Sequence, residues 1–460
     1  MPKFELMWTD AFVWLMVLVV LGYIIHVGRT PALRQAWRSV FYTPSAMACA
    51  VVLAFFVVVG LLDSMHYRPV LPALEGQTEQ RYSPIARSVL DDVLEATHIA
   101  KKERSYSAPF ATHLFFKESA IVDGQVVRDF PVLENAAQTV STAAEHRHLV
   151  WKLALWSALG AVVVAIVLGA LCLQGARHNP AFPWRSLWLS LTVLISLLVF
   201  ILVFSRFYYV LGTDRSGNDV LYLSFKSIRT ALVIGTLTTV AMLPPALIFG
   251  IAAGYFKGWV DDVIQYIYTT LTSIPGVLLI AACVLMMQVY MDTHAELFDT
   301  VASRADLRLL VLCLILGFTG WAGLCRLLRA EVLKLRELEY VQAAKAFGVS
   351  AWGIMLRHLL PNVMHLVLIT LVLEFSGLVL YEAVLSYLGI GVDPSMPSFG
   401  TMIDAARLEM SRDPMIWWNL VGAFFFLLAL VLSANLFADA VQRAFDPRVR
   451  RIEAKGAAHA

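Results

Sequence analysis

The sequence predicts an all-α integral membrane protein: a polytopic helical bundle of about nine transmembrane helices with a small α+β domain outside the membrane. Two observations predict this class. Of the 460 residues, 59% are hydrophobic and only 15% are charged, whereas a soluble protein of this length needs a larger charged surface. The apolar residues also gather in blocks of about 20, the length that crosses a bilayer core of about 30 Å.

Nine apolar blocks are predicted to be the transmembrane helices. Backbone groups in hydrocarbon must pair within a helix or a closed barrel, and these blocks are too long and too continuously apolar for barrel strands. The first block is expected to be a retained span, because its flank lacks the basic excess and the small-residue cleavage site of a signal peptide. The blocks lie at residues 11–28, 46–62, 149–173, 186–206, 229–255, 263–290, 308–327, 363–388 and 416–437.

The distribution of charge predicts an outside N-terminus and a cytoplasmic C-terminus. Cytoplasmic connections carry an excess of Lys and Arg. Basic residues dominate the connections 29–38, 174–185 and 326–358 and the C-terminal tail, whereas residues 389–414 lean acidic. The alternate connections therefore agree on one topology.

Residues 63–148 form a sizeable polar region, which is expected to be the small α+β domain. Ser83 and Pro84 precede the apolar pattern of an amphipathic helix, and Asp123-Gly124 is typical of the turn of a β-hairpin over residues 120–127. The predicted division is two transmembrane helices in 1–62, the outer domain in 63–148, an accessory helix and linker in 149–185, a core in 186–450 and a tail in 451–460.

The most informative stretch runs from Glu339 to Gly348 and continues to Leu360-Pro361, in the longest predicted cytoplasmic connection of the apolar half. Its pattern predicts two short helices with a bend between them. Gly348 suits a left-handed C-cap, Ser350 suits the next N-cap, and Pro361 is expected to end that second helix. Such a pair of helices suits a lever that is moved by a soluble motor.

One face of the first short helix is predicted to be apolar, because Val341, Ala344 and Phe347 share it at helical spacing. Ala343 lies beside this face. Ala343 and Ala344 are small and would allow the surface of another protein to approach closely. An ordinary interfacial helical hairpin is the alternative interpretation of the same pattern.

The stretch resembles the cytoplasmic coupling loop of bacterial ABC importer permeases, known as the EAA loop. The family pattern is Glu-Ala-Ala, three residues, Gly, and then Ile/Leu-x-Leu-Pro. Gln342 stands in the position of the name-giving Glu, so the resemblance leaves open the charge contact with the ATPase. The residues assigned to ATPase coupling are Glu339, Tyr340, Gln342, Ala343, Ala344, Gly348, Leu360 and Pro361.

Further motifs make residues 186–450 resemble the dipeptide, oligopeptide and nickel permease family, and in particular the "C" partner of its permease pair. The chain departs from this family at Tyr266 and Thr269, where relatives often carry charges, and in residues 1–185, which hold no recognised motif. The matching residues are Gly212-Thr213-Asp214, Gly217, Asp219-Val220-Leu221, Arg229, Gly254-Tyr255, Gly258-Trp259, Asp261, Ile274-Pro275, Trp321, Arg326, Arg329, Glu331, Glu339, Tyr340, residues 385–392, Pro394, Pro397-Ser398 and Asp446-Pro447-Arg448.

The resemblance implies a permease subunit of an ATP-driven importer in the bacterial inner membrane, with a core of six spans. It also implies alternating access, in which closure of the motor pushes the loop 339–361. The implied partners are a second, homologous "B"-type permease subunit, two cytoplasmic ABC ATPase subunits, an extracytoplasmic substrate-binding protein and the lipid bilayer. Dipeptides or oligopeptides are the expected cargo on family frequency, and nickel complexes and other small solutes stay open.

No constellation for catalysis stands out in the sequence. A Gly-x-x-x-x-Gly-Lys-Ser/Thr phosphate loop is missing, and Gly250 and Gly254 lie in an apolar helix, where small residues let helices approach each other. The five cysteines lie in or at the ends of apolar blocks, and His146 and His148 have no further ligands nearby. No metal, cofactor or nucleic-acid partner is expected, and ATP hydrolysis is assigned to separate subunits.

Two carboxylates are placed within one predicted span. Glu374 and Glu382 are eight residues apart, so they project within about 80° of each other on a helix. A carboxylate inside a membrane usually faces a cavity or a partner, which predicts a role in lining the pore or a subunit interface. A packing role is the alternative for both, and it is favoured for Glu382.

Two other classes of function stay open. A secondary transporter needs ion or proton sites within the membrane and usually an inverted repeat, and no convincing repeat is visible. A membrane sensor would use residues 63–148 as its receptor domain. It would also need a cytoplasmic output domain, and only about twenty residues follow the last predicted span.

Overall fold

The computed structural model describes residues 3–71, 81–122, 125–135, 142–294, 296 and 300–445. The chain divides into two compact units. Unit 1 contains Met1–Leu232 and Pro394–Phe437, and unit 2 contains Val233–Asp393 and Ala438–Ala460. The helices α7 (Val220–Phe256) and α16 (Trp418–Phe445) therefore each contribute residues to both units.

Within the described residues, nine helices are long and apolar enough to cross a membrane, which confirms the predicted all-α membrane class. The extent predicted for the block 263–290 is wrong. The chain there forms α8 (Trp259–Ser273) and α9 (Gly276–Thr293), and only α9 has the length and composition of a span. The break falls at Ile274-Pro275 because proline has no backbone N–H and its ring clashes with the preceding turn.

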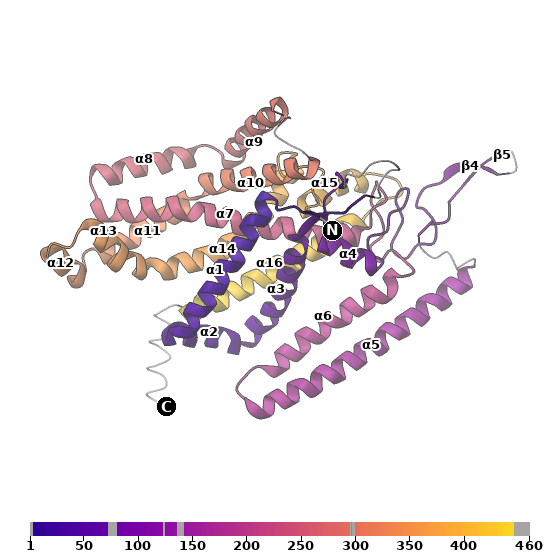
Figure 1. Ribbon diagram of the computed structural model, residues 1–460, viewed down its shortest axis with the longest axis horizontal. Helices are drawn as coiled ribbons and strands as arrows, with labels where there is room; N and C mark the ends of the chain where they lie inside the picture. Colours follow the sequence, from indigo (N-terminus) through magenta and orange to yellow (C-terminus); the bar gives the residue numbers. More distant parts are fainter. Residues whose placement is uncertain are drawn as a thin grey trace. The chain divides into compact units, whose positions relative to one another are not determined.

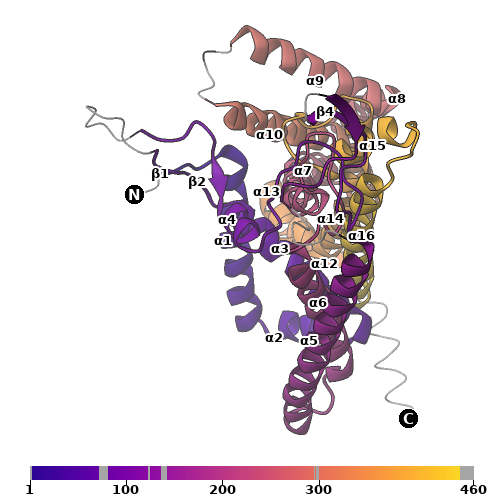
Figure 2. The ribbon, with the colours of Figure 1, turned by 90° about the vertical axis from the view of Figure 1, so that its right-hand side faces the viewer.

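Unit 1 holds two N-terminal spans, a long helical hairpin, the outer domain and the first turns of α7. α5 (Ala143–His178) and α6 (Trp184–Ser205) form this hairpin and run side by side in both views (Figures 1 and 2). Gly169 permits this close approach, because the indole of Trp188 lies against it and donates from Nε1 to the Ala165 carbonyl oxygen at 2.9 Å. The helices are α1 (Trp8–Arg29), α2 (Pro31–Tyr42), α3 (Pro44–Asp63), α4 (Val89–Ala96), α5 (Ala143–His178), α6 (Trp184–Ser205) and α15 (Phe399–Met410).

Within the described part of the chain, residues 63–148, the predicted outer domain, supply four of the five strands of two small antiparallel sheets, and the fifth strand joins the first sheet from the N-terminal segment. β1 (Lys3–Phe4), β2 (His66–Arg68) and β3 (Arg87–Ser88) form one sheet in that order, with β2 in the centre. β4 (Glu118–Val122) and β5 (Gln125–Asp129) form the predicted hairpin. The turn residues Asp123 and Gly124 lie outside the described residues.

The start predicted for the amphipathic helix is wrong. α4 begins at Val89, and its N-cap is Ser88 rather than Ser83. Ser88 and Asp91 form a capping box, in which the Ser88 side chain accepts from the Asp91 N–H and the Asp91 carboxylate accepts from the Ser88 N–H. The preceding residues are extended because Arg87 and Ser88 pair with β2, and this leaves Ile85 exposed.

Residues 63–148 are joined by hydrogen bonds to the loop before α7. The Glu103 N–H donates to the Gly217 carbonyl oxygen at 2.8 Å, and Thr213 exchanges hydrogen bonds with the backbone of Ser105 and Ser107. Gly217 has a φ of +77°, and a Cβ there would lie 1.9 Å from the Glu103 carbonyl oxygen. This loop therefore requires glycine at position 217 for two separate reasons.

Unit 2 is a helical bundle around one apolar core. At this core α7 lies against α11 (Ala322–Leu335), because Gly250 and Gly254 leave room for Leu328 and Val332. This close approach is expected of small residues in an apolar helix. α8 is joined to α11 by an ion pair in which Arg329 Nη2 donates to Asp261 Oδ2 at 2.7 Å. The remaining elements are α10 (Val301–Gly320), α11 (Ala322–Leu335), α12 (Glu339–Ala346), α13 (Ala351–Ile354), a π-helix (Met355–Leu359) and α14 (Leu360–Tyr387).

Candidate functional site

The candidate coupling site is the short helix α12 with the turn and helix that follow it. Val341 anchors α12, because only 2% of its surface is exposed and it packs into the apolar core of unit 2 beside Ile354 and Leu359. Ala344 lies at the edge of the same core. The prediction that Phe347 shares this buried face is wrong, because its side chain is 88% exposed. Phe347 is the C-cap of α12, and six residues of helix turn it about 120° away from Val341.

Gly348 reverses the chain after α12. Its φ is +76°, in the left-handed region that the sequence pattern predicts. The Gly348 N–H donates to the Lys345 carbonyl oxygen at 3.1 Å, and the Val349 N–H donates to the Ala344 carbonyl oxygen at 3.1 Å. These two bonds form a Schellman motif, which satisfies carbonyl groups that the helix end would otherwise leave unpaired.

The second helix begins as predicted and ends differently. The Ser350 side chain accepts from the Gly353 N–H at 3.2 Å and so caps α13. The expectation that Pro361 ends this helix is wrong, because helical backbone continues from α13 through the π-helix into α14. Pro361 stands in the first turn of α14, where the preceding π-turn changes the hydrogen-bond register, so that the missing N–H of proline is tolerated.

Polar side chains on α12 bond to neighbouring backbone and to α14. The Tyr340 hydroxyl accepts from Asn362 Nδ2 at 3.1 Å. Gln342 Nε2 donates to the Arg336 carbonyl oxygen at 3.0 Å and lies 3.5 Å from Glu337 Oε2. A Glu at position 342 could not donate to the carbonyl and would face a second carboxylate. The local structure therefore explains the Gln that departs from the family pattern.

Charged residues that are not among those predicted for the coupling site join it to the end of α7. Arg336 donates to the Tyr255 carbonyl oxygen. Lys257 Nζ lies 3.1 Å from Glu337 Oε1, and this hydrogen bond lowers the pKa of the Glu337 carboxyl. Opposite charges placed just after two neighbouring helices were the available signal. A cleft of about 250 Å³ lies beside these contacts, lined by Tyr255, Phe256, Arg336, Val341, Gln342, Lys345 and Ala351.

The turn exposes large apolar side chains. Phe347 and Trp352 are 88% and 66% exposed, and Val349 between them is also exposed. We call these three residues the apolar tip. Contiguous exposed apolar groups are typical of a surface that another protein or a membrane covers. Glu339 and Ala343 are exposed as well, so most of the residues assigned to coupling lie at the surface of unit 2.

The two carboxylates of α14 have different surroundings. Glu374 is exposed at the surface of this chain, in the middle of an apolar span. Glu382 is 1% exposed and accepts a hydrogen bond from Ser386 Oγ at 2.6 Å.

His146 Nδ1 lies 3.0 Å from the Tyr208 hydroxyl. The described part of the chain holds no group of three or more residues that could bind a metal ion.

The helical spans and the site together define a multi-pass membrane protein of the importer permease class. A family profile described as "Binding-protein-dependent transport system inner membrane component" matches residues 246–451. The chain belongs to this family of ABC importer permease subunits. It is 30% identical to two OppC relatives, and the aligned residues cover 77% of the length of each relative. Subunits of this family serve transport, and ATP hydrolysis belongs to separate ATPase subunits.

Curated relatives match about half of this chain. The dipeptide transport system permease protein DppC of Bacillus subtilis is 29% identical over 241 residues, which are 52% of this chain and 69% of the relative. The oligopeptide transport system permease protein OppC of Mycobacterium tuberculosis is 30% identical and covered over 77% of its length, with 53% of this chain aligned.

Two further likenesses are more partial. The peptidoglycan transport system permease protein YejE of Agrobacterium fabrum is 34% identical over 52% of this chain and 57% of its own length. A solved structure of the MetNI methionine ABC transporter in inward-facing conformations matches 48% of this chain and 94% of that chain, at 17% identity and a TM-score of 0.36.

Proposed function

We propose that this chain is a "C"-type permease subunit of a peptide importer. It would pair with a homologous "B"-type permease, two cytoplasmic ABC ATPases and an extracytoplasmic substrate-binding protein. The names of the relatives, which specify transport of dipeptides, oligopeptides and peptidoglycan, support a cargo built of peptide. The family membership supports an inner-membrane location in bacteria.

The observation that carries the coupling role is the exposed turn after α12. Val341 and the bonds from Arg336 and Lys257 hold the base of this element on the bundle, while the apolar tip stays exposed. Because α12 is anchored at its base and exposed at its tip, a force applied to the tip can be transmitted to the helices that α12 contacts. In this proposal ATP-driven closure of the motor moves α12, and α11 and α14 tilt with it to switch the side on which the pore opens.

A site-specific photo-cross-linker tests this contact in native membranes. Placed at Phe347, it should capture an ATPase subunit, because that side chain is 88% exposed. The matched control is Val341, which lies in the same helical element at 2% exposure and should capture nothing from outside the chain. Capture of lipid alone from Phe347, or of the ATPase equally from both positions, would contradict the proposed docking surface.

We also propose that Glu374 lines the pore or the contact with the sister permease. Its support is its exposure on a span that is otherwise apolar, since an ionised group facing lipid is costly. Glu374→Gln keeps the shape and removes the charge, so altered uptake at an unchanged amount of complex is expected. Glu382→Gln is the comparison, because Glu382 is buried within this chain. An effect of the Glu382 change only would contradict this assignment.

The proposed topology places the N-terminus and the outer domain outside and the C-terminus in the cytoplasm, with residues 186–450 as the permease core and 1–185 as an extension. Single cysteines in exposed positions test it through labelling of intact cells with a membrane-impermeant reagent. A cysteine at Ile85 should be labelled from outside and one at Phe347 only after lysis. The reverse pattern would overturn the topology.

Identification of the cargo needs the intact importer. The proposal expects that the binding protein co-purified with this complex carries peptides, which mass spectrometry of the released ligand would identify. It also expects that unlabelled peptides compete with uptake of a labelled peptide. A binding protein loaded with a metal complex or a sugar would refute the peptide assignment and leave the permease role in place. Uptake that persists without the ATPase would favour a secondary transporter instead.

A further inference from the structure

Two buried cations lie in the first turns of the long helix α7. Lys226 and Arg229 are three residues apart, and their side chains are 13% and 6% exposed. Ionised groups that are buried in the fold are costly unless they are paired. The residues that pair with these two cations therefore show which segments of the chain stabilise α7.

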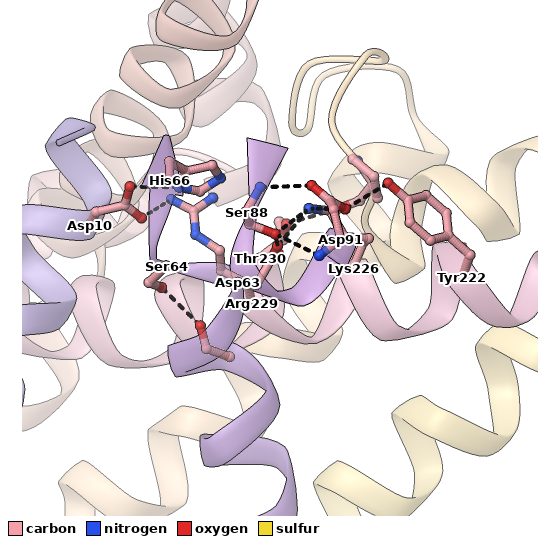
Figure 3. Close-up of polar contacts among 12 residues, drawn as sticks. Asp10, Asp63, Ser64, His66, Ser88, Asp91, Tyr222, Lys226, Arg229 and Thr230 are labelled. Atoms are coloured by element: carbon pink, nitrogen blue, oxygen red, sulfur yellow. Dashed lines mark hydrogen bonds and ion pairs between the residues drawn. The ribbon is translucent and has the colours of Figure 1, made fainter. Parts of the chain in front are cut away.

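Arg229 is paired with a carboxylate from the first transmembrane helix (Figure 3). Its Nη2 lies 2.6 Å from Asp10 Oδ1 and 2.6 Å from Thr9 Oγ1. Asp10 is fully buried, and its other oxygen lies 2.8 Å from His66 Nδ1, at the start of β2. One carboxylate thus joins α1, β2 and α7.

Lys226 is paired with two carboxylates from other elements (Figure 3). Its Nζ lies 2.5 Å from Asp63 Oδ1, at the end of α3, and 3.0 Å from Asp91 Oδ1, in the first turn of α4. Ser88 Oγ donates to Asp63 at 2.7 Å, and the Tyr222 hydroxyl donates to Asp91 at 2.9 Å. The carboxylates are therefore held in place by their own neighbours as well as by the cation.

All three carboxylates come from the N-terminal extension, in which no family motif was recognised, and Arg229 is one of the residues that carry the family resemblance. α7 continues from these pairs into unit 2, where Gly250 and Gly254 pack on α11. The extension thus supplies the charges that pair with the N-terminal end of α7. The C-terminal end of α7 packs in unit 2, which also contains α12.

We propose that Asp10, Asp63 and Asp91 are positioning residues for transport, and that the extension is a permanent intramolecular clamp on α7 rather than a separable module. The clamp deepens the proposed importer function and rests on it. Because separation of the pairs would leave buried charges without partners, the clamp stays closed while the rest of the transporter moves.

The test compares single and paired neutral substitutions in the complete importer reconstituted in vesicles. Asp10→Asn leaves the Arg229 guanidinium without its carboxylate, and Arg229→Gln leaves the Asp10 carboxylate with His66 alone. Each should lower the maximal uptake rate per assembled complex by about tenfold or more. The KM for loaded binding protein should not change, because the clamp does not touch cargo. The double variant D10N/R229Q removes both charges and should recover to within about threefold of the unmodified importer.

Two neighbours on α4 provide a matched control. Asp91→Asn removes a charge that faces Lys226 and keeps an oxygen to accept from the Ser88 N–H, so uptake should fall. Asp92→Asn changes a side chain that is 47% exposed and lies 3.6 Å from Arg87, so uptake should stay unchanged. Equal effects of the two substitutions would overturn the clamp, as would a double variant D10N/R229Q no better than its worse single variant.

The melting temperature of the purified chain in detergent separates this proposal from the importer function. D10N should lower it by about 5 °C, and D10N/R229Q should restore most of the loss. If the peptide assignment fails, the unmodified importer takes up no peptide, while the melting comparison still decides whether the clamp exists. If the clamp is wrong, the unmodified importer is active and the single variants match it in both measurements.

Discussion

Replacing Gly348 with Val tests whether the turn after α12 transmits the push of the ATPase. Nothing lies within 4 Å of the position that a Cβ on Gly348 would occupy, so the side chain itself fits. The penalty comes from the backbone alone, because φ is +76° and a β-branched residue rarely adopts that value. A non-glycine residue in the left-handed region costs about 2 kcal/mol, which shifts the equilibrium of the turn about 30-fold.

The assay measures three quantities on Gly348→Val: the amount in the membrane, peptide uptake per complex, and ATP hydrolysis stimulated by loaded binding protein. Membrane insertion should persist, because the buried anchor Val341 is unchanged. Uptake should fall by about tenfold, and stimulated hydrolysis should fall with it, because the tip no longer meets the motor in register.

Gly348→Asn is the matched control, since Asn tolerates the left-handed region better than other side chains. It should retain most of the uptake that Val loses. Stimulated hydrolysis and uptake at the unmodified level in the Val variant would refute the coupling role of the turn. An Asn variant as inactive as the Val variant would refute the backbone explanation.

Three further predictions concern other contacts. Arg329→Met removes the partner of Asp261 between α8 and α11 and should cost about 2 kcal/mol of stability; an unchanged melting temperature would show that the pair does not hold α8. Burial raises the pKa of the Asp219 carboxyl to about 8 from its ordinary value of 3.8, so the folded chain keeps a proton that the unfolded chain releases between these values. Stability should therefore fall as pH rises through that window, and Asp219→Asn should flatten the dependence of melting temperature on pH; a profile that keeps its slope would contradict the assignment. Gly217→Ala would place a Cβ 1.9 Å from the Glu103 carbonyl oxygen and should loosen the outer domain, which limited proteolysis would detect as faster cleavage; cleavage at the unmodified rate would argue against this packing.

The extension changes how the family core should be studied in this chain. Its charges pair with α7, and its outer domain bonds to the loop before α7 through Glu103 and Gly217. Deletion of residues 65–147 would therefore remove Asp91 and leave Lys226 with one carboxylate partner fewer. Loss of uptake in such a deletion would report on the stability of α7 as much as on a binding role of the domain, and point substitutions are the sharper experiment.

Local sequence signals predicted the parts of the site that depend on a few neighbouring residues. The spans follow from the length and continuity of apolar blocks, since lipid forces every backbone group to pair within its own helix. The left-handed turn follows from Gly348, and the capping of α13 follows from Ser350, because both depend on backbone within a few residues. The family motifs indicated where the coupling helix lies for the same reason.

Only the tertiary structure decided which side chains the fold buries and which charges it pairs. Helical spacing placed Phe347 with Val341, but packing against the bundle buries Val341 and leaves Phe347 at the tip. Arg229 and Asp10 are 219 residues apart in sequence and bond directly. Burial and ion pairing depend on segments that meet only after the helices have packed, so no window of sequence contains both partners. The sequence determined the helices and the turn, and their packing decided what the turn exposes and what holds α7.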